Sequence, residues 1–565
     1  MKIRYGGTFS RILEKRVGVP PRISQSASPM IFCAVNGRTP LSQIRYSTTN
    51  AIKADDHQER HVYNGHHVEL SSPPEGDWRL YRYNELSPRP FAIRLVEILP
   101  GETEAIHCLI HETDLGNHTS QHPTFDALSY EWGSEAFETH ICCDGMVIPV
   151  TQNLHSALRH LRNATTRRLA WIDALCINQA DVLERSRQTA LMSHIFRCAR
   201  QVVAWLGAAD KHTERAFSLI EAVSSSIRSY APGGSFKGDA RTIWDKKAMA
   251  KMNLPRCPSP EWEALARLFE RQYFRRLWVV QELVVSPNAV VWCGSFSLGW
   301  AQVEHVASLI ISTGWMRALQ ELYGVTVRPS FIQTIRNCKL HFHETRGGSG
   351  MGLAFLLCST RRFQTSDPRD KIIALIGLTR DAEKYSNLTN YSRSIAELYL
   401  EVTGELILAD QSLLLLSSVE DQSDRRLQAL PSWVPDYSVW RQRSILGLPI
   451  RHSRYGAATA IPTTARWSPG SFDLHVDGVC HDQIEAVTMN SLDNSATAHK
   501  FVLQCLGLSD PLLRRGTVTI DSIWRTLIGN TGGNTYPAPE MYRIFPKLPV
   551  SFKRKEKPFS EDAHG

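Results

Sequence analysis

Short apolar runs alternate with amphipathic segments in the first half of this 565-residue chain, and this alternation is the strongest constraint on its fold. Four runs have the length and composition of buried strands: residues 125–130, 169–172, 202–206 and 288–293. The segments between them carry apolar residues at helical spacing, at 151–162, 182–199 and 260–285. Buried strands separated by such helices favour a parallel sheet covered on both faces. The right-handed crossover rule makes this sheet a doubly wound α/β layer.

Local signals refine this outline. Asp144-Gly145 is a strong turn dipeptide and predicts a small hairpin over residues 140–150. Asp181 and Glu184 have the spacing of a capping box that opens a helix. Ser259 precedes a proline and predicts the start of another helix, which either continues or breaks before residues 278–285. Two further strands are expected at 92–97 and 108–110.

Polar residues follow the predicted strands. In doubly wound folds, ligands bind at the carboxyl ends of the parallel strands. Ser129, Glu131, Asp173 and Gly207 lie at or just beyond such ends. The sequence therefore predicts a functional site along this edge of the sheet.

The net charge of +8 is concentrated in the first fifty residues. That segment carries eight Lys and Arg against the single acid Glu14, so the rest of the chain is close to neutral. No basic surface element with interleaved aromatic residues is evident there, which excludes nucleic-acid binding by the fold. The basic, Ser-rich segment 1–50 is typical of a mitochondrial transit peptide, or of a disordered extension that follows a wrongly chosen start codon.

Twelve cysteines without any C-x-x-C pair indicate reduced intracellular thiols, so we expect a cytoplasmic protein, with mitochondria as the alternative. Cys338, His341 and His343 resemble half of a zinc site, but no second half follows at zinc-finger spacing, and we expect no metal. No apolar run of about 18 residues occurs, which disfavours a membrane-spanning helix.

Composition divides the chain into four parts. We expect a basic leader and disordered linker over 1–75, an α/β domain over 76–300, and a helical extension over 301–440, in which 396–408 is the clearest helix. A mixed α/β region with a disordered tail is expected over 441–565.

Several blocks in fixed order carry a family resemblance. They are Phe125-Asp-Ala-Leu-Ser-Tyr-Glu-Trp-Gly133, Trp171-Ile-Asp-Ala-Leu-Cys-Ile-Asn-Gln179, Val203-Ala-Trp-Leu-Gly207, Arg276-Leu-Trp-Val-Val-Gln-Glu282, Asp367-Pro-Arg-Asp-Lys-Ile-Ile-Ala-Leu-Ile-Gly-Leu378 and Leu430-Pro-Ser-Trp-Val-Pro-Asp436. Over residues 80–480 the chain resembles fungal heterokaryon incompatibility (HET) domain proteins. The resemblance implies a role in non-self recognition between fungal cells and in programmed cell death.

The HET domain is regarded as a distant relative of Toll/interleukin-1 receptor (TIR) domains, which implies a TIR-like, flavodoxin-like parallel sheet. The segment Trp278-Val-Val-Gln-Glu282 is similar to the TIR helix whose W-x-x-x-E holds the catalytic Glu of NAD-cleaving members. Glu282 is therefore the candidate catalytic residue, and NAD is a candidate substrate rather than a cofactor.

A carboxylate near the nicotinamide ribose stabilises the positive charge that develops when the glycosidic bond breaks. The alternative is that Glu282 pairs with Arg275, Arg276 or Arg185 and only fixes its helix. The candidate substrate-binding residues are Ser129, Tyr130, Trp132, Asp173, Arg185 and Trp278.

Each of these candidates has a structural alternative. Asp173 contacts ribose or caps the turn that follows it. Tyr130 and Trp132 contact ligand or belong to the core. Arg185 meets a phosphate or pairs with nearby acids, and the thiol of Cys176 is expected to be buried and inert.

Two functions remain open at this point. The first is an NAD glycohydrolase that is activated by self-association through the HET domain. The second is a non-catalytic module that docks protein partners to trigger cell death.

Overall fold

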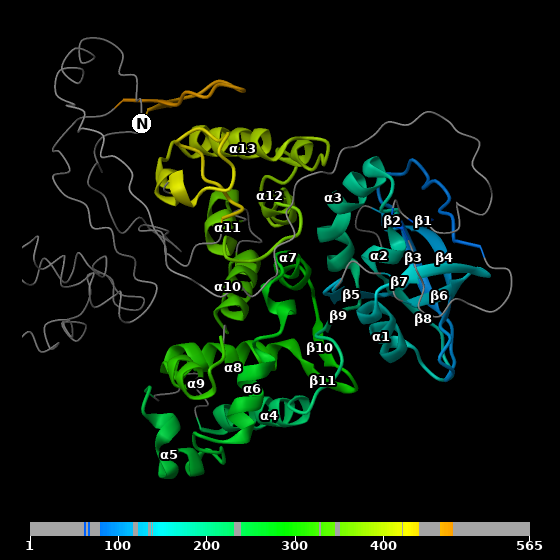
Figure 1. The fold of residues 1–565 in the computed structure, drawn as a ribbon, viewed down its shortest axis with the longest axis vertical. Helices are drawn as coiled ribbons and strands as arrows, with labels where there is room; N and C mark the ends of the chain where they lie inside the picture. The colour runs from blue at the N-terminus through cyan, green and yellow to red at the C-terminus, as the bar shows by residue number, and fades with distance from the viewer. Residues whose placement is uncertain are drawn as a thin grey trace, which may run out of the picture.

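The structure is a computed structural model that describes most of the chain between residues 79 and 439 (Figure 1). The described residues are 62–63, 66–67, 79–116, 122–133, 137, 139–230, 239–326, 329–344, 351–420, 422–439 and 464–477. The predicted leader 1–50 and most of the predicted region 441–565 lie outside them. In the part of the chain that is described, no helix is long and apolar enough to cross a membrane.

A nine-stranded sheet organises the first half of the chain, in the order β11-β10-β9-β5-β8-β3-β4-β6-β7. Its central strands are β5 (Asp126–Tyr130), β8 (Arg168–Trp171), β9 (Gln201–Trp205) and β10 (Ala289–Cys293). These four are parallel and close to the predicted strands. Counted along the chain as strands 1 to 4, they lie in the order 2-1-3-4, so the chain changes direction across the sheet between β5 and β9.

The sheet is mixed, however, and the expected parallel pairing holds for these four strands and for residues 107–108 with 142–143. β3 (Ala92–Ile98) pairs antiparallel with both β8 and β4 (His107–Asp114). The short loop between β3 and β4 requires an antiparallel pair, because a parallel pair needs a long crossover. β11 (Phe296–Gly299) likewise follows β10 after a tight turn and runs antiparallel to it.

The hairpin predicted around Asp144-Gly145 is confirmed at the far edge of the sheet. β6 (Thr139–Cys143) and β7 (Met146–Val150) pair antiparallel. Asp144 and Gly145 both have positive φ angles, 51° and 75°. Two-residue hairpin loops of this kind need positive φ at both positions, which Gly adopts without strain.

Side-chain caps start the helices close to the expected positions. Thr151 caps α1 (Gln152–Leu161), Asp181 caps α3 (Val182–Cys198) and Ser259 caps α6 (Pro260–Leu268). The segment 260–285 is broken. After α6 comes the 3₁₀ turn η4 (Gln272–Arg275), and then α7 (Trp278–Val284).

The capping box predicted at Asp181 is wrong in its second half. Glu184 does not reach back to the Asp181 backbone but forms a buried ion pair with Arg94 of β3, at 2.6 Å. The Glu184 carboxylate also accepts from the Asn178 backbone N–H, and Arg94 donates to the Cys176 carbonyl. The pair therefore fixes α2 (Asp173–Cys176) and the loop after it against the sheet.

A column of helices stands beside the sheet (Figure 1). It contains α10 (Pro329–Glu344), α11 (Leu353–Thr360), α12 (Asp370–Ile376) and α13 (Ile395–Asp410). A second group, α4 (Thr213–Tyr230), α5 (Lys246–Lys251), α8 (Trp300–Thr313) and α9 (Trp315–Tyr323), lies at the other end. The described residues between 301 and 410 are largely helical, and α8 packs directly against α4 of the preceding segment. The boundaries 301–440 of the expected helical extension stay a prediction.

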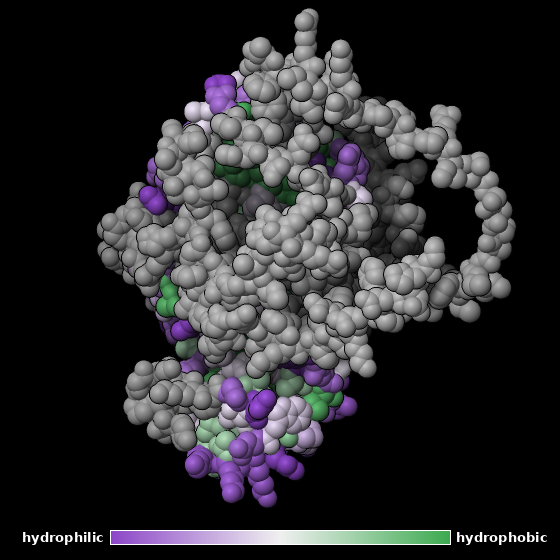
Figure 2. All heavy atoms as spheres, turned by 90° about the vertical axis from the view of Figure 1, so that its left-hand side faces the viewer, coloured by the Kyte–Doolittle hydropathy of each residue, from purple (hydrophilic) through white to green (hydrophobic). Residues whose placement is uncertain are grey.

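The surface of that second group is polar at its tip. Figure 2 shows hydrophilic side chains gathered at the lower end of the molecule, where Figure 1 places α5 with its exposed Lys246, Lys247 and Lys251.

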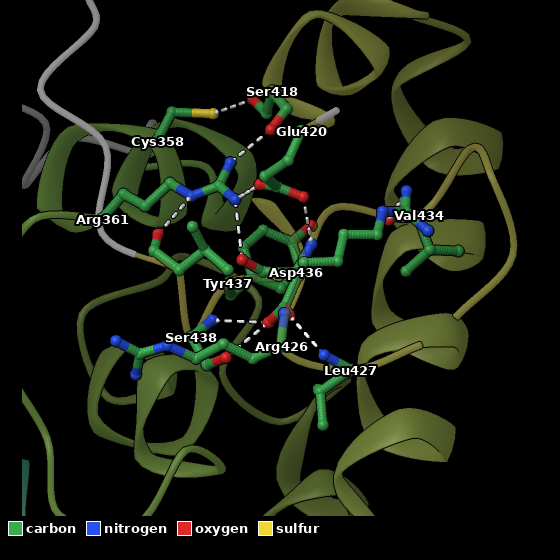
Figure 3. Close-up of polar contacts among 12 residues, drawn as sticks. Cys358, Arg361, Ser418, Glu420, Arg426, Leu427, Val434, Asp436, Tyr437 and Ser438 are labelled. Carbon is green, nitrogen blue, oxygen red and sulfur yellow. Dashed lines mark hydrogen bonds and ion pairs between the residues drawn. The ribbon is translucent and has the colours of Figure 1, made fainter. Parts of the chain in front are cut away.

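The block Leu430–Asp436 closes the helical column. Arg361, just after α11, donates to the carbonyls of Ser418, Asp436 and Val439 and pairs with Glu420 (Figure 3). Asp436 in turn accepts from the backbone N–H groups of Arg426, Leu427 and Ser438. These buried polar groups satisfy one another, so the contacts of this block are structural.

The predicted small β region is seen in part. β12 (Ala465–Arg466) and β13 (His475–Val476) form a short antiparallel ladder. Trp467 lies so close to Gly404 of α13 that a Cβ at residue 404 would come within 2.5 Å of its ring.

Removing one member of the Arg94–Glu184 pair leaves an uncompensated buried charge. We expect Arg94→Leu to lower the free energy of unfolding by about 3–5 kcal/mol. Urea unfolding at pH 7 measures this, with the double variant Arg94→Leu/Glu184→Leu beside it. The double variant should regain part of the loss, and a double variant as unstable as the sum of both single variants would contradict the pairing.

Candidate functional site

Glu282 lies in α7, against the carboxyl end of β5. The Ser129 hydroxyl, at the end of β5, donates to its carboxylate, and the Tyr273 hydroxyl lies 2.7 Å from the same Ser129 oxygen. Glu282 is only 3% exposed and Ser129 only 1%. A buried chain of three polar side chains therefore joins β5, η4 and α7.

Asp173 forms the outer part of the same site. It follows β8 directly and begins α2. One carboxylate oxygen accepts from the Ala174 N–H at 2.7 Å, and the other accepts from the Trp132 indole N–H at 2.9 Å. Trp132 is 39% exposed and thus lies at the solvent side, whereas Tyr130 is buried beneath it in the core.

Arg276 lies near both Glu282 and Asp173, and from the sequence it was expected only as one of three arginines that pair with Glu282 in the structural alternative. It stands between η4 and α7 and is close enough to influence the pKa of Glu282, Asp173 and Tyr130. The signal that pointed to it was its place within the block that ends at Glu282. Among the described residues, no Lys or Arg forms an ion pair within 4 Å of Glu282, so the alternative pairing with Arg275, Arg276 or Arg185 is not seen there.

Burial dominates the electrostatics of the site. It raises the pKa of Glu282 to about 7, against the opposing effects of Arg276 and of the Ser129 hydrogen bond. Burial also raises the pKa of Asp173, while Arg276 and the hydrogen bond from Trp132 oppose that shift. The site thus holds a carboxyl that exchanges its proton near neutral pH, which suits acid–base chemistry.

The loops beside the site are fixed by structural contacts. Asn153 of α1 donates to the Glu131 carbonyl at 2.6 Å and accepts from the Trp205 indole at 2.9 Å. Beyond β9, Gly207 adopts a φ of 102° and Arg271 donates to the Leu206 carbonyl. The loops that follow β5 and β9 are therefore held in place where the chain changes direction.

Two predicted site residues lie elsewhere. The Trp278 indole donates to Asp370 of α12 at 3.0 Å, and the Tyr391 hydroxyl donates to the same carboxylate at 2.6 Å. The Arg185 guanidinium lies 4.8 Å from the centre of the Tyr391 ring. Burial raises the pKa of Asp370 to about 6. The structure places Trp278 and Arg185 in this second cluster, apart from the contacts of Glu282, and their role in substrate binding stays a prediction.

Helix α7 is enclosed by α3 and α12. The Gln281 amide, oriented to satisfy both neighbours, donates to the Ala374 carbonyl and accepts from the Ser193 N–H. Gly377 follows α12 at the same place, and a Cβ there would come within 2.6 Å of Ser193. The block 367–378 thus packs directly onto the helix that carries Glu282.

The remaining candidates are structural. Trp171 and Trp205 are core residues, at 0% and 1% exposed. Cys176 is buried, and burial raises the pKa of its thiol to about 12, which leaves it unreactive. His341 of α10 packs on the Phe355 ring. Among the described residues, no group of three or more His, Cys, Asp or Glu side chains is arranged to hold a metal ion.

Comparison with known proteins connects this region to one family. Residues 125–282 match the family model "Heterokaryon incompatibility protein (HET)". The chain is also similar to heterokaryon incompatibility protein 6, OR allele, of Neurospora crassa, with 27% identity over 416 residues. The aligned part covers 64% of this chain and 60% of the relative. No solved structure matches the chain.

These matches support the expectation of a heterokaryon incompatibility protein. The family match begins with β5 and ends at Glu282, so it spans the elements that build the site. The chain spans less than two thirds of the length of this relative, so the match says nothing about the activity or the partners of the whole protein.

The raised pKa of Glu282 predicts a specific pH dependence of stability. The Glu282 carboxyl takes up a proton more readily in the folded chain than in the unfolded one. Its contribution to the free energy of unfolding is therefore complete below pH 4.5 and declines as the pH rises to about 7. The decline amounts to at most about 3 kcal/mol, at 1.36 kcal/mol per pKa unit. Glu282→Gln should remove it.

Urea unfolding of both proteins at pH 5 and pH 8 measures this difference. The variant should gain stability relative to the parent chain as the pH rises. If the two proteins lose stability in parallel between these pH values, the Glu282 carboxyl is not the titrating group.

Proposed function

We propose that this chain acts in non-self recognition between fungal cells, and that its α/β core does so by cleaving the bond between nicotinamide and ribose in NAD. The family match supports the first part. One observation carries the second: the buried Glu282 carboxyl, whose pKa is about 7, stands at the carboxyl edge of the parallel strands and forms no ion pair within the described residues.

The topology supports the same proposal. Strand order 2-1-3-4 is that of flavodoxin-like folds, in which ligands bind where the chain changes direction between the first and third strands. Here those strands are β5 and β9, and Ser129 lies at the end of β5. A TIR-like core would have its NAD site at this edge.

The reaction needs one carboxylate and one water. The bond between the nicotinamide nitrogen and the ribose carbon breaks, and its electron pair leaves with nicotinamide. The ribose carbon becomes positively charged and is stabilised by the Glu282 carboxylate. Water then forms the new carbon–oxygen bond, and Glu282 accepts its proton before releasing it to solvent.

The neighbouring residues hold Glu282 in position. The Ser129 hydroxyl donates to its carboxylate, and Tyr273 lies on the other side of Ser129. Asp173 and Trp132 are joined to each other at the solvent side, where they would contact the ribose hydroxyls and the nicotinamide ring.

A second function is favoured by the exposed apolar side chains near the site. Val182 and Leu183, at the start of α3, are 41% and 67% exposed, and Trp132 is exposed as well. Such side chains suit a non-catalytic module that docks a protein partner or a second copy of the chain.

We infer the cytoplasm as the place of action. All nine described cysteines are free thiols, which fits a reducing compartment. Mitochondrial import through residues 1–50 is the alternative, and that segment lies outside the described residues.

Glu282→Gln should abolish NAD cleavage. We expect kcat/KM for NAD to fall by about 10²-fold or more, because one electrostatic group at a reacting centre contributes about that much. Chromatography of NAD, nicotinamide and ADP-ribose after incubation with concentrated or cross-linked full-length protein measures it. The control is Glu304→Gln, since Glu304 of α8 is another partly buried carboxyl with a raised pKa, bound to Trp300.

The same variants separate the two functions in cells. Overexpression in a fungal host should arrest growth with the parent chain and the Glu304 variant but not with Glu282→Gln. Arrest that persists in Glu282→Gln, together with unchanged NAD levels, would replace the enzymatic proposal by the docking module.

A further inference from the structure

The backbone on either side of Arg276 is held in place by hydrogen bonds. The Leu277 N–H donates to the Gln364 carbonyl at 2.9 Å, and the Gln364 N–H donates to the Arg275 carbonyl at 2.6 Å. These two bonds form a short bridge between the segment after η4 and the segment before α12. The Arg276 N–H itself donates to the Tyr273 carbonyl. The side chain of Arg276 therefore starts from backbone that is held on both sides.

The guanidinium of Arg276 lies close enough to the polar groups of the site to influence their pKa values. It acts to lower the pKa of four groups around it: Tyr130, Asp173, Tyr273 and Glu282. These groups come from β5, α2, η4 and α7. Arg276 is thus the positive charge that all of them share.

Arg276 nevertheless lacks the contacts that such a group normally has. Its Nη1 atom is buried and has no hydrogen-bond partner in the described part of the chain. No carboxylate of the described residues lies within 4 Å of it as an ion-pair partner. A buried donor without a partner is costly, and such groups in native proteins call for an explanation.

Among the described residues, the Nε atoms of Arg185 and Arg425 also lack a partner. Arg94 and Arg168 show the contrast. Arg94 binds both oxygens of Glu184 and two backbone carbonyls. Arg168 binds Asp126 through two nitrogens. Both guanidinium groups are bound by carboxylates of the chain, as is usual for structural arginines. Arg276, by contrast, has an unpaired Nη1 donor near Glu282.

We propose that Arg276 binds a phosphoryl group of the substrate, and that the site therefore selects phosphorylated nucleotides over free nucleosides. The proposal rests on the proposed function, because it takes the ribose to lie at Glu282. In NAD the phosphoryl group is attached to the same ribose whose bond to nicotinamide breaks. The planar fork of a guanidinium matches phosphoryl oxygens, and a buried charge-assisted bond to an oxyanion is strong.

The surrounding charges explain why an arginine is required. Glu282 and Asp173 would repel an anionic substrate if no cation lay near them. Arg276 offsets that repulsion and offers its unused Nη1 to the incoming oxygen. A nucleoside without a phosphoryl group would leave this donor unpaired.

Binding measured without turnover tests the inference. Calorimetry with ADP-ribose, inorganic pyrophosphate and nicotinamide riboside is carried out on the full chain and on Arg276→Gln, Arg276→Lys and Arg275→Gln. Loss of a charge-assisted bond should weaken ADP-ribose and pyrophosphate binding by about 10-fold or more in Arg276→Gln. Arg276→Lys should weaken it less, and Arg275→Gln should not change it. The riboside should bind equally to all four proteins.

The outcomes for Arg276 and for Glu282 are distinguishable. Equal ADP-ribose binding by the parent chain and a folded Arg276→Gln would overturn the inference, as would the absence of ADP-ribose binding by the parent chain. If Arg276→Gln does not fold, undiminished binding by Arg276→Lys overturns it instead. Binding that depends on Arg276, without NAD cleavage that depends on Glu282, would keep the anion site and remove the glycohydrolase.

Discussion

The burial of the Glu282 carboxyl is the constraint on which the site depends. A carboxyl in this position must find a polar partner, and it accepts a hydrogen bond from Ser129 at the end of a strand. Ser129 in turn contacts Tyr273, which belongs to a turn far along the chain. The break after α6 makes this arrangement possible. In one continuous helix, Tyr273 and Glu282 would be about 14 Å apart along the axis, too far for both to reach Ser129. The turn η4 and the bridge to Gln364 bring them to one hydroxyl.

Helix α7 is short and buried on nearly all sides, so each of its faces serves a different neighbour. Glu282 meets the end of β5, Trp278 meets Asp370, and Gln281 lies between α3 and α12. A helix that is enclosed in this way gains its stability from packing rather than from its own propensity. The helical column is consequently part of what positions the candidate site.

The sequence predicted the central strands, the hairpin and the helix starts because each depends on local signals such as apolar runs, Asp144-Gly145 or a capping residue. It also predicted that Ser129, Glu131, Asp173 and Gly207 lie at one edge of the sheet. The antiparallel half was missed because the pairing of β3 with β8 joins residues far apart in the chain. The role of Glu184 was missed for the same reason: its carboxylate pairs with Arg94, far away in the chain, instead of with the nearby backbone N–H of Asp181.

Trp278 and Glu282 are four residues apart, which puts them on one side of α7, but this spacing carries no information about the residue that the Trp278 indole contacts. Asp370, 92 positions further along the chain, binds the indole. Arg276 belongs to the block Arg276–Glu282 that was identified in the sequence. What distinguishes it from a structural arginine is that its Nη1, near Glu282, has no hydrogen-bond partner among the described residues. Such an absence is a property of the folded chain and has no sequence signature.

The crowding at Gly377 bears on how sequence variation can arise in this protein. Because no side chain larger than hydrogen fits between Ser193 and Gln281, residue 377 and its two neighbours can change only in concert. A chimaera that took its α/β core from this chain and its helical column from a homologue with a larger residue at position 377 would bring that side chain against Ser193 and Gln281. An exchange of the helical column is therefore tolerated only if it keeps glycine at this position or also changes the two side chains that face it.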